Sequence, residues 1–279
     1  MAPAATTPSD VGDFWEPQAY STSAPFVATS SPTLVQLLQA HGSERILDVG
    51  CGDGEFTANF IDSAGFVLGI DASAKMIKAA KSRFGSEKAE FRVVDCRYLD
   101  KEPPIVDGSW DKVITNSALH WILRDEETRM PTFKAIHAAL KQNGRFYFEF
   151  GGHGHVSEAF TALLSMLVQH GYSMEEAKAI NRWFFPSKEW TQHMLEKAGF
   201  AVEMIEVEYR PTKLTDVDEG GLAGWIQLLG APMINAIPAA QRSQAVKQVC
   251  EILDPVVTKP EDGSKWLGYV RLRGVARKS

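Results

Sequence analysis

The sequence has few cysteines and no clustered positive charge. Its three cysteines, Cys51, Cys96 and Cys250, are widely spaced and form no CxxC pair or Cys/His finger pattern. We therefore expect reduced thiols and no structural zinc. Lys and Arg total 29 against 35 Asp and Glu, a formal net charge of -6, and the only basic cluster is Arg277-Lys278 at the end of the chain. Because a nucleic-acid groove must neutralise several phosphates, this balance disfavours a nucleic-acid partner.

The sequence also shows little sign of a secretory signal or of a membrane-spanning helix. The first eight residues contain no basic region and no apolar stretch, so we expect no secretory signal and a cytoplasmic location. Residues 220–241 carry no charge, but Pro232, Pro238 and several glycines interrupt them. A helix that faces lipid must satisfy every freed backbone group, so we interpret this stretch as a pocket-lining or mobile segment and expect no membrane contact.

Apolar residues are plentiful, at 44% of 279 residues, which is enough for a substantial core and excludes disorder and collagen-like fibres. Short β-branched or aromatic runs alternate with helical stretches up to residue 150. The runs cover 45–49, 66–70, 90–94, 110–115 and 144–150, and the helical stretches cover 32–41, 54–62, 73–83 and 126–141. This alternation predicts an α/β fold with a parallel sheet covered on both faces and a ligand beyond the carboxyl ends of the strands.

The regular alternation stops after residue 150. The remaining sequence predicts one or two helices within 152–186, a helix over 187–198, a strand over 201–209, a helical region over 210–262 and a last strand over 266–274.

A glycine-rich loop follows the first predicted sheet strand. Gly50, Gly52 and Gly54 are spaced G-x-G-x-G, which lets the backbone turn sharply and pass close to a ligand. A dinucleotide fingerprint requires G-x-G-x-x-G, but Glu55 occupies the position of its third glycine. Asp53 and Glu55 also place negative charge at the start of the following helix, where a pyrophosphate would bind. NAD is therefore disfavoured.

Acidic residues lie at the ends of three neighbouring predicted strands: Asp48, Asp71 and Asp95. Asp71 follows Gly50 by about twenty residues, where a carboxylate accepts both ribose hydroxyls of a nucleoside cofactor. A row of acids suits a ligand with a cationic centre, a ribose and an adenine amino group, whereas it would repel a diphosphate.

Together these motifs resemble the class I S-adenosylmethionine-dependent methyltransferases. The resemblance covers residues 45–150 and rests on LDVGCGDG, on GID ending at Asp71, on VDC ending at Cys96, on VITNSALHW over 113–121 and on LKQNGRFYF over 140–148. It implies a Rossmann-like doubly wound sheet of seven strands, the last one antiparallel, with helical insertions that cover the substrate. It also implies an enzyme that consumes S-adenosyl-L-methionine, releases S-adenosyl-L-homocysteine and needs no metal.

The resemblance assigns cofactor contacts to individual residues. Gly50 and Gly52 would face the methionine, Asp71 the ribose, Asp95 and Cys96 the adenine, and the Asn116 carbonyl the methionine amino group; Ala72 and Met76 would flank the adenine, Asp48 would orient the loop through water, and Tyr20 and Ser117 complete the set. Gly54 permits close helix packing as an alternative to ligand contact. Residues 1–30 are expected to form a partly disordered arm that covers the cofactor. Residues 31–279 are expected to form one methyltransferase domain with inserts at 152–186 and 210–262, as a monomer or a homodimer.

Within that family the small-molecule branch that includes trans-aconitate methyltransferase is similar to this chain at weaker matches, among them Trp15, the Leu119-His-Trp turn and the Tyr269-Val-Arg-Leu-Arg segment. The aromatic-rich inserts favour a small, fairly hydrophobic acceptor. The alternative, that these rings only pack the inserts onto the sheet, stays open. We predict substrate contacts from Trp121, His153, Trp183, Phe185 and Trp225.

Candidate catalytic residues are His120, Tyr20 and His155, as bases or as positioning groups. The His153-Gly-His155 pair lacks a third ligand at a recognisable spacing, so we expect no metal there. No Asp/His pairing is evident, which favours an acceptor that ionises unaided, either a carboxylate, as in the trans-aconitate branch, or a thiol, as in fungal thiomethyltransferases of secondary metabolism. Arg182 and Arg210 are candidate carboxylate ligands. A non-catalytic cofactor-binding subunit is the alternative class.

Overall fold

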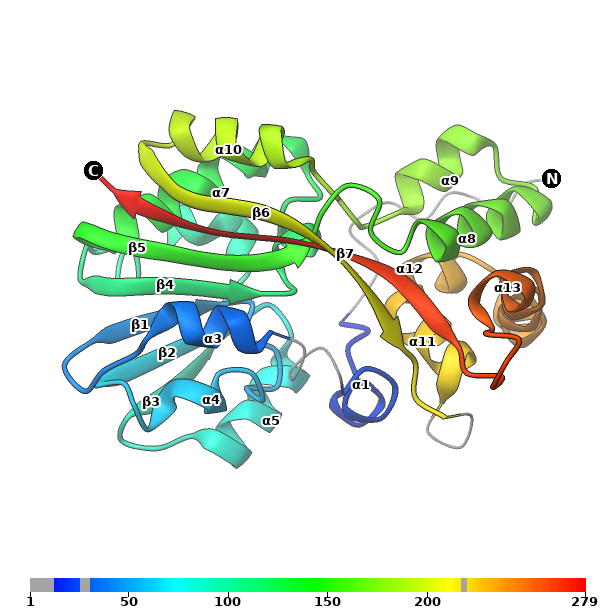
Figure 1. Cartoon of the computed structure of the whole chain (residues 1–279), viewed down its shortest axis with the longest axis horizontal. Helices are drawn as coiled ribbons and strands as arrows, with labels where there is room; N and C mark the ends of the chain where they lie inside the picture. Colours follow the sequence, from blue (N-terminus) through cyan, green and yellow to red (C-terminus); the bar gives the residue numbers. More distant parts are fainter. Residues whose placement is uncertain (1–12, 26–30, 217–219) are drawn as a thin grey trace. The chain divides into compact units, whose positions relative to one another are not determined.

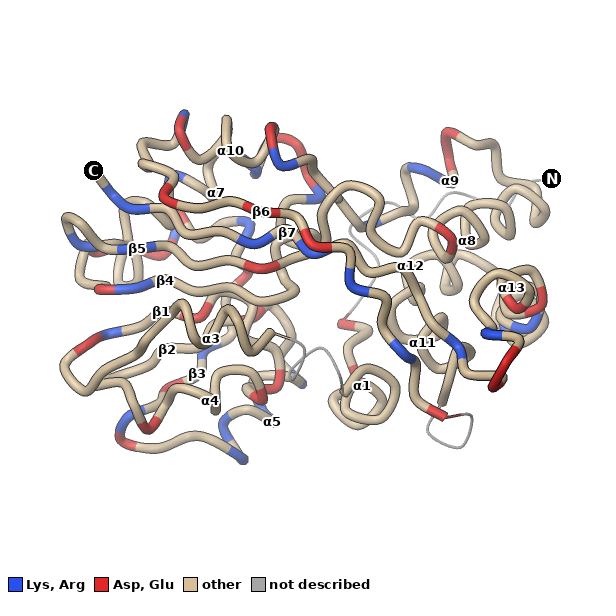
Figure 2. Tube along the Cα trace, viewed as in Figure 1, with Lys and Arg blue, Asp and Glu red and all other residues tan. Residues whose placement is uncertain are grey.

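The computed structural model describes residues 13–25, 31–216 and 220–279, so residues 1–12 and 26–30 of the arm predicted over 1–30 lie outside the described part. The chain forms two compact units (Figure 1). The sheet unit comprises Phe26–His153, Trp183–Glu208 and Val270–Ser279. The helical unit comprises Met1–Pro25, Gly154–Arg182 and Tyr209–Tyr269. Basic and acidic positions are interspersed along the trace of both units (Figure 2).

Seven strands form one sheet in the order β3-β2-β1-β4-β5-β7-β6. The strands are β1 (Arg45–Val49), β2 (Phe66–Asp71), β3 (Ala89–Val93), β4 (Trp110–Asn116), β5 (Leu140–Gly151), β6 (Phe200–Lys213) and β7 (Trp266–Lys278). Strands β1 to β5 pair in parallel, and β7 pairs antiparallel with β5. The strand order reverses between β1 and β4, which confirms the predicted doubly wound sheet with an antiparallel last strand.

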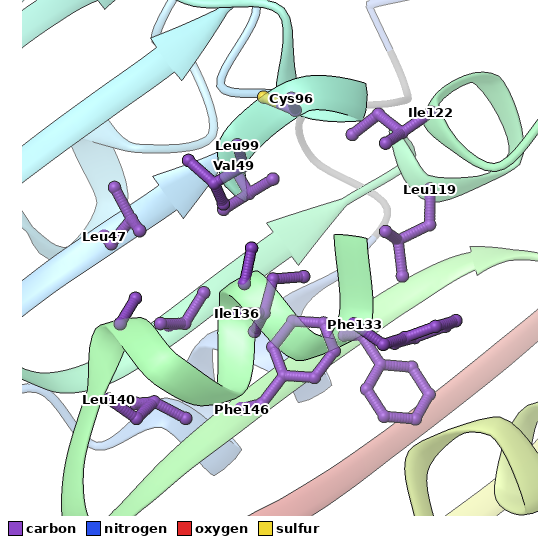
Figure 3. Packing of buried hydrophobic residues seen from close by; sticks show 14 of the residues in the cluster. Leu47, Val49, Cys96, Leu99, Leu119, Ile122, Phe133, Ile136, Leu140 and Phe146 are labelled. Atoms are coloured by element: carbon purple, nitrogen blue, oxygen red, sulfur yellow. The ribbon is translucent and has the colours of Figure 1, made fainter. Parts of the chain in front are cut away.

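Helices cover both faces of the sheet unit. One face packs against α3 (Pro32–Leu38), α4 (Ala58–Ile61) and α5 (Ala74–Phe84), and the other against α6 (Leu119–Ile122), α7 (Glu126–Ala139) and α10 (Lys188–Lys197). Alternate residues of β1 serve the two cores: Leu47 and Val49 join the α7 side, where Ile136 and Phe146 pack nearby (Figure 3), and Ile46 joins the α3 side. The short 3-10 helix η1 (Cys96–Lys101) follows β3.

Several predicted boundaries are wrong: β5, for example, begins at Leu140 and β7 continues to Lys278, whereas the sequence predicts strands over 144–150 and 266–274. The helix expected over 32–41 ends at Leu38, because Gln39 adopts a left-handed φ of 44°. The helix expected over 54–62 covers only Ala58–Ile61, since turns occupy the residues after Gly54. Strand β6 continues to Lys213, so it takes the first residues of the predicted helical region 210–262.

The helical unit contains residues 154–182 of the predicted insert 152–186, and the predicted insert 210–262 falls within its Tyr209–Tyr269 segment. Its helices are α1 (Pro17–Ser23), α8 (Ser157–Gln169), α9 (Met174–Ile180), α11 (Gly221–Leu229), α12 (Ala231–Asn235), η3 (Ala239–Gln241) and α13 (Arg242–Val257). Gly230 and Pro238 divide the uncharged stretch 220–241 into short helices. Among the described helices, none combines the length and the apolar character that a membrane crossing requires.

Candidate functional site

The loop between β1 and α4 needs glycine at two positions for different reasons. Gly50 and Gly52 have φ values of 76° and 57°, in the left-handed region. A Cβ at Gly50 would lie 2.2 Å from the Cβ of Ala118, so this glycine lets the loop abut the turn after β4. A Cβ at Gly52 would meet nothing within 4 Å, so the loop leaves open space there for a ligand. At Gly54 a Cβ would lie only 3.0 Å from Phe84, as expected for close packing against α5.

Asp71 ends β2 and is bonded to the glycine loop. Its Oδ2 accepts a hydrogen bond from the Gly52 amide at 3.1 Å, and its Oδ1 accepts one from the Ser73 amide at 2.8 Å. These bonds fix the orientation of the carboxylate beside the open space at Gly52. A carboxylate oxygen has more than one acceptor site, so both oxygens can also accept ribose hydroxyls.

Asp48 lies beneath the loop and is almost fully buried, at 1% exposure. Its Oδ2 accepts from the Thr57 hydroxyl at 2.7 Å, while its Oδ1 has no hydrogen-bond partner among the described residues. Burial raises the pKa of Asp48 to about 7, with the charge of Asp71 as a smaller cause. The unpaired oxygen is the atom through which Asp48 can hold a water or a proton under the loop.

Asp95 begins the segment predicted to meet the adenine. Arg97 donates to both of its oxygens and also pairs with Asp125 at 2.6 Å. Burial opposes ionisation of Asp95, but the hydrogen bonds from Arg97 hold the pKa of Asp95 below its usual range. Cys96 is buried, and burial raises the pKa of its thiol well above the usual range, so it stays protonated. Met76 on α5 is buried as well, whereas Ala72 is exposed.

Asn116 and Ser117 form the turn at the end of β4. Ser117 has a φ of 57°, uncommon for a residue other than glycine, and its amide donates to the Glu149 carbonyl at 2.7 Å. The Asn116 side chain is buried, and its Oδ1 accepts from Ser31 at 2.9 Å and from Arg271 at 3.2 Å. The Ser31 hydroxyl therefore joins the site and makes no side-chain cap to α3.

A buried ionic network, which was not predicted from the sequence, lies beside this turn. Glu149 is fully buried, and it accepts from Arg271 at 3.0 Å and from Arg273 at 2.6 Å. The signal in the sequence was the alternation of the two arginines on β7, which places both on one face of the sheet. The predicted carboxylate ligands were Arg182 and Arg210, and not Arg271 and Arg273.

Four of the predicted acceptor-side residues form one aromatic cluster in the sheet unit: His120, Trp121, Trp183 and Phe185. The His120 ring lies 5.7 Å from Trp121 and 5.5 Å from Phe185, and Trp183 lies 5.9 Å from Trp121. The Phe184 amide donates to the His120 carbonyl at 2.9 Å, which holds this segment against α6. These contacts bring together residues from two distant parts of the chain.

The buried imidazole of His120 is neutral. Its Nδ1 accepts from the Gly151 amide at 3.3 Å, which leaves the proton on Nε2. Burial, together with a smaller contribution from the nearby positive charge of Arg271, lowers the pKa of His120 to about 3. A histidine with this pKa suits a positioning role better than that of a base at neutral pH.

The other predicted residues belong to the helical unit or to another segment of the sheet unit. His155 and Trp225 belong to the helical unit, where Trp225 donates to the Tyr269 hydroxyl at 2.7 Å and the His155 ring lies 4.7 Å from Tyr269. Tyr20 lies on α1 of the same unit. His153 is exposed and is the last residue of the Phe26–His153 segment of the sheet unit.

Comparison with known proteins identifies the family. A model described as a methyltransferase domain matches residues 46–144. A protein of Schizosaccharomyces pombe, named as an uncharacterized methyltransferase, is 34% identical over 267 residues, which are 95% of this chain and 98% of that protein. The chain belongs to the methyltransferases. This methyltransferase is also 28% identical, over 172 residues and 59% of each chain, to juvenile hormone acid O-methyltransferase of Bombyx mori.

The fold of this methyltransferase is shared with a solved structure that carries the demethylated cofactor. A phosphoethanolamine N-methyltransferase of Haemonchus contortus, in complex with S-adenosylhomocysteine, has a TM-score of 0.52 and 19% identity, over 89% of this chain and 52% of that one. The open space at Gly52, the oriented Asp71 carboxylate and the unpaired Asp48 oxygen fit S-adenosylmethionine. Within the described ranges, no group of three or more His, Cys, Asp or Glu side chains is placed to hold a metal ion.

Proposed function

We propose that this methyltransferase moves the methyl group of S-adenosylmethionine to an oxygen or sulfur of a small, fairly hydrophobic metabolite. One observation carries the proposal. The glycine loop abuts Ala118, and His120 and Trp121 of the aromatic cluster follow within the same turn and helix. A cofactor in the loop and an acceptor among the rings would therefore meet at the end of β4.

In this proposal each cofactor contact keeps the role that the resemblance implies. Asp71 holds the ribose, Asp95 and Cys96 lie at the adenine edge, and Asn116 and Ser117 meet the methionine. The cofactor supplies an activated methyl group bound to a sulfonium. The residues of the chain must then hold the acceptor in line with that group and exclude water, and such orientation is worth effective molarities on the order of 10^5 M or more.

A carboxylate is the preferred acceptor and a thiolate the alternative, because both ionise without a base. The neutral His120, with a pKa of about 3, supports an acceptor of this kind. The similarity to an acid O-methyltransferase favours the carboxylate. The net charge of -6 favours a metabolite over a nucleic acid.

Two measurements test the proposal. The purified chain should bind S-adenosylhomocysteine in calorimetry, and it should transfer labelled methyl from S-adenosylmethionine to a component of a metabolite extract. Binding without any S-adenosylhomocysteine formation would favour the non-catalytic subunit, and no binding of either nucleoside would refute both readings.

A further inference from the structure

Two arginines of β7 point to the same face of the sheet but differ in their surroundings. Arg273 is opposite Glu149 in the β5–β7 register, and Arg271 is opposite Gly151, nearer the carboxyl edge of the parallel strands. Arg271 is 3% exposed and Arg273 is 4% exposed. The pair therefore offers a comparison of two buried guanidinium groups two residues apart.

All three side-chain nitrogens of Arg273 have a carboxylate partner. Its Nε donates to Glu149 at 2.6 Å, its Nη1 to Glu206 at 2.7 Å and its Nη2 to Glu208 at 2.6 Å. Since three carboxylates surround one guanidinium, Arg273 needs no further anion.

Two of the three side-chain nitrogens of Arg271 donate hydrogen bonds to described residues. Its Nε donates to Glu149 at 3.0 Å, and its Nη2 donates to Ser117 at 2.7 Å and to Asn116 at 3.2 Å. Its Nη1 has no hydrogen-bond acceptor among the described residues.

The charge of Arg271 is only partly compensated. Among the residues that the structure describes, its single charged partner is Glu149, which it shares with Arg273. A buried guanidinium is costly unless an anion pairs with it, and its planar fork matches a carboxylate. An anion at Nη1 would complete the pairing.

The position of Arg271 in the fold indicates which anion binds to Nη1. Its Nη2 is bonded to the Asn116-Ser117 turn, where the proposed function puts the methionine end of the cofactor. Its charge also acts on His120, a member of the aromatic cluster. An anionic group held by Nη1 would therefore lie close to the proposed site of methyl transfer.

We propose that Arg271 binds the carboxylate of the acceptor through Nη1, and that this carboxylate receives the methyl group. The inference rests on the proposed function and names its substrate class, a carboxylic acid with a hydrophobic body. One carboxylate oxygen forms a bond to the methyl carbon while the carbon–sulfur bond breaks, and the bonding electron pair stays on sulfur. The products are a methyl ester and neutral S-adenosylhomocysteine, and no proton moves.

The carboxylate of the cofactor's own methionine is the alternative anion for Nη1 of Arg271.

The test compares Arg271→Gln with Arg273→Gln in the full chain. In Arg271→Gln, Glu149 keeps its bonds from Arg273 and Ser31, so no buried charge is left alone. Arg271→Lys restores the charge and serves as a rescue variant, and thermal unfolding reports whether each variant folds.

Four compounds separate the two sources: benzoate and its neutral analogue benzamide, S-adenosylhomocysteine, and 5′-methylthioadenosine, which lacks the amino-acid group. Benzoate, but not benzamide, should bind the protein saturated with S-adenosylhomocysteine in NMR titration. Arg271→Gln should weaken benzoate binding about tenfold or more, with partial rescue by Arg271→Lys, while Arg273→Gln leaves it within about twofold. Affinity for 5′-methylthioadenosine should stay the same in Arg271→Gln, and affinity for S-adenosylhomocysteine should fall less than affinity for benzoate, because Arg271 touches the cofactor only through the Asn116-Ser117 turn.

Several results would overturn the inference. Equal losses in both glutamine variants would mean a structural role, and failure of wild-type protein to bind benzoate would remove the site. Loss of S-adenosylhomocysteine binding with unchanged 5′-methylthioadenosine binding would assign Arg271 to the cofactor. Labelled product that resists mild alkali would exclude a methyl ester, whereas release of labelled methanol supports it. Absence of any methyl transfer, with benzoate still bound through Arg271, would refute the proposed function and leave the carboxylate site standing.

Discussion

Replacing Asp71 with alanine removes the acceptor that we assign to the cofactor ribose. Each hydrogen bond from a ribose hydroxyl to a carboxylate contributes about 1.5 to 3 kcal/mol, so the loss of even one weakens binding by about tenfold or more. The same change removes the acceptors of the Gly52 and Ser73 amides, at 3.1 and 2.8 Å, which loosens the glycine loop. Both effects act in the same direction, so we expect at least a tenfold rise in the Kd for S-adenosylhomocysteine.

Titration calorimetry with S-adenosylhomocysteine measures this effect. Asp71→Asn keeps an amide oxygen for one of the loop amides but removes the charge, so its affinity should fall between those of wild type and Asp71→Ala. Asp62→Ala is the matched control, since Asp62 is an exposed acid just after α4 in the same unit. An unchanged Kd in a folded Asp71→Ala protein would refute the ribose assignment and the cofactor geometry that depends on it.

Three further predictions concern the loop, the buried acid and the histidine. Gly50→Ala should destabilise the protein by about 1 to 3 kcal/mol in denaturant unfolding, because its Cβ would meet Ala118 at 2.2 Å, and Gly52→Ala should cost less; equal costs would contradict the close approach. The pKa of Asp48 is raised to about 7, so its protonated form stabilises the fold at low pH and this contribution is lost as pH rises from about 4 to 7. The unfolding free energy of Asp48→Asn should therefore lack this fall, and parallel pH curves for the two proteins would count against a raised pKa. With a pKa of about 3, His120 does not titrate between pH 5 and 8, so wild type and His120→Gln should show the same inflections in kcat/KM over this range. An inflection that is present in wild type and lost in His120→Gln would make His120 a base.

The sheet and the cofactor loop could be predicted from sequence because their signals are local. Parallel strands buried on both faces are short apolar runs, and the glycine spacing and strand-end acids lie within a few residues of those runs. Helix ends were harder, since Gln39 gives no sign of the left-handed φ that ends α3 at Leu38. The predicted strand over 201–209 is shorter than β6, which continues through Pro211 because a proline is tolerated in an edge strand.

The protonation of His120 and the pairing of Glu149 could not be predicted, because both depend on partners far along the chain. Gly151, which donates to His120, lies 31 positions away, and Arg271 lies 122 positions from Glu149. Charged residues on predicted strands are usually exposed, so the sequence alone favours solvent contact for all of them. Only the register of β5 with β7 puts the two arginines over the same buried carboxylate.

The buried ionic network contributes more to the placement of the site than to stability. Removing a fully buried carboxylate and two guanidinium groups from water is costly, and well-packed apolar residues often stabilise such a position at least as well. The bonds of this network, however, end on Asn116 and Ser117, and Ser31 reaches both Asn116 and Glu149. We infer that the network fixes the strained turn after β4, since Ser117 keeps a φ of 57° only where its surroundings hold it. If this network also holds an anion at the turn, one nitrogen of Arg271 must lack a partner among the described residues, as Nη1 does.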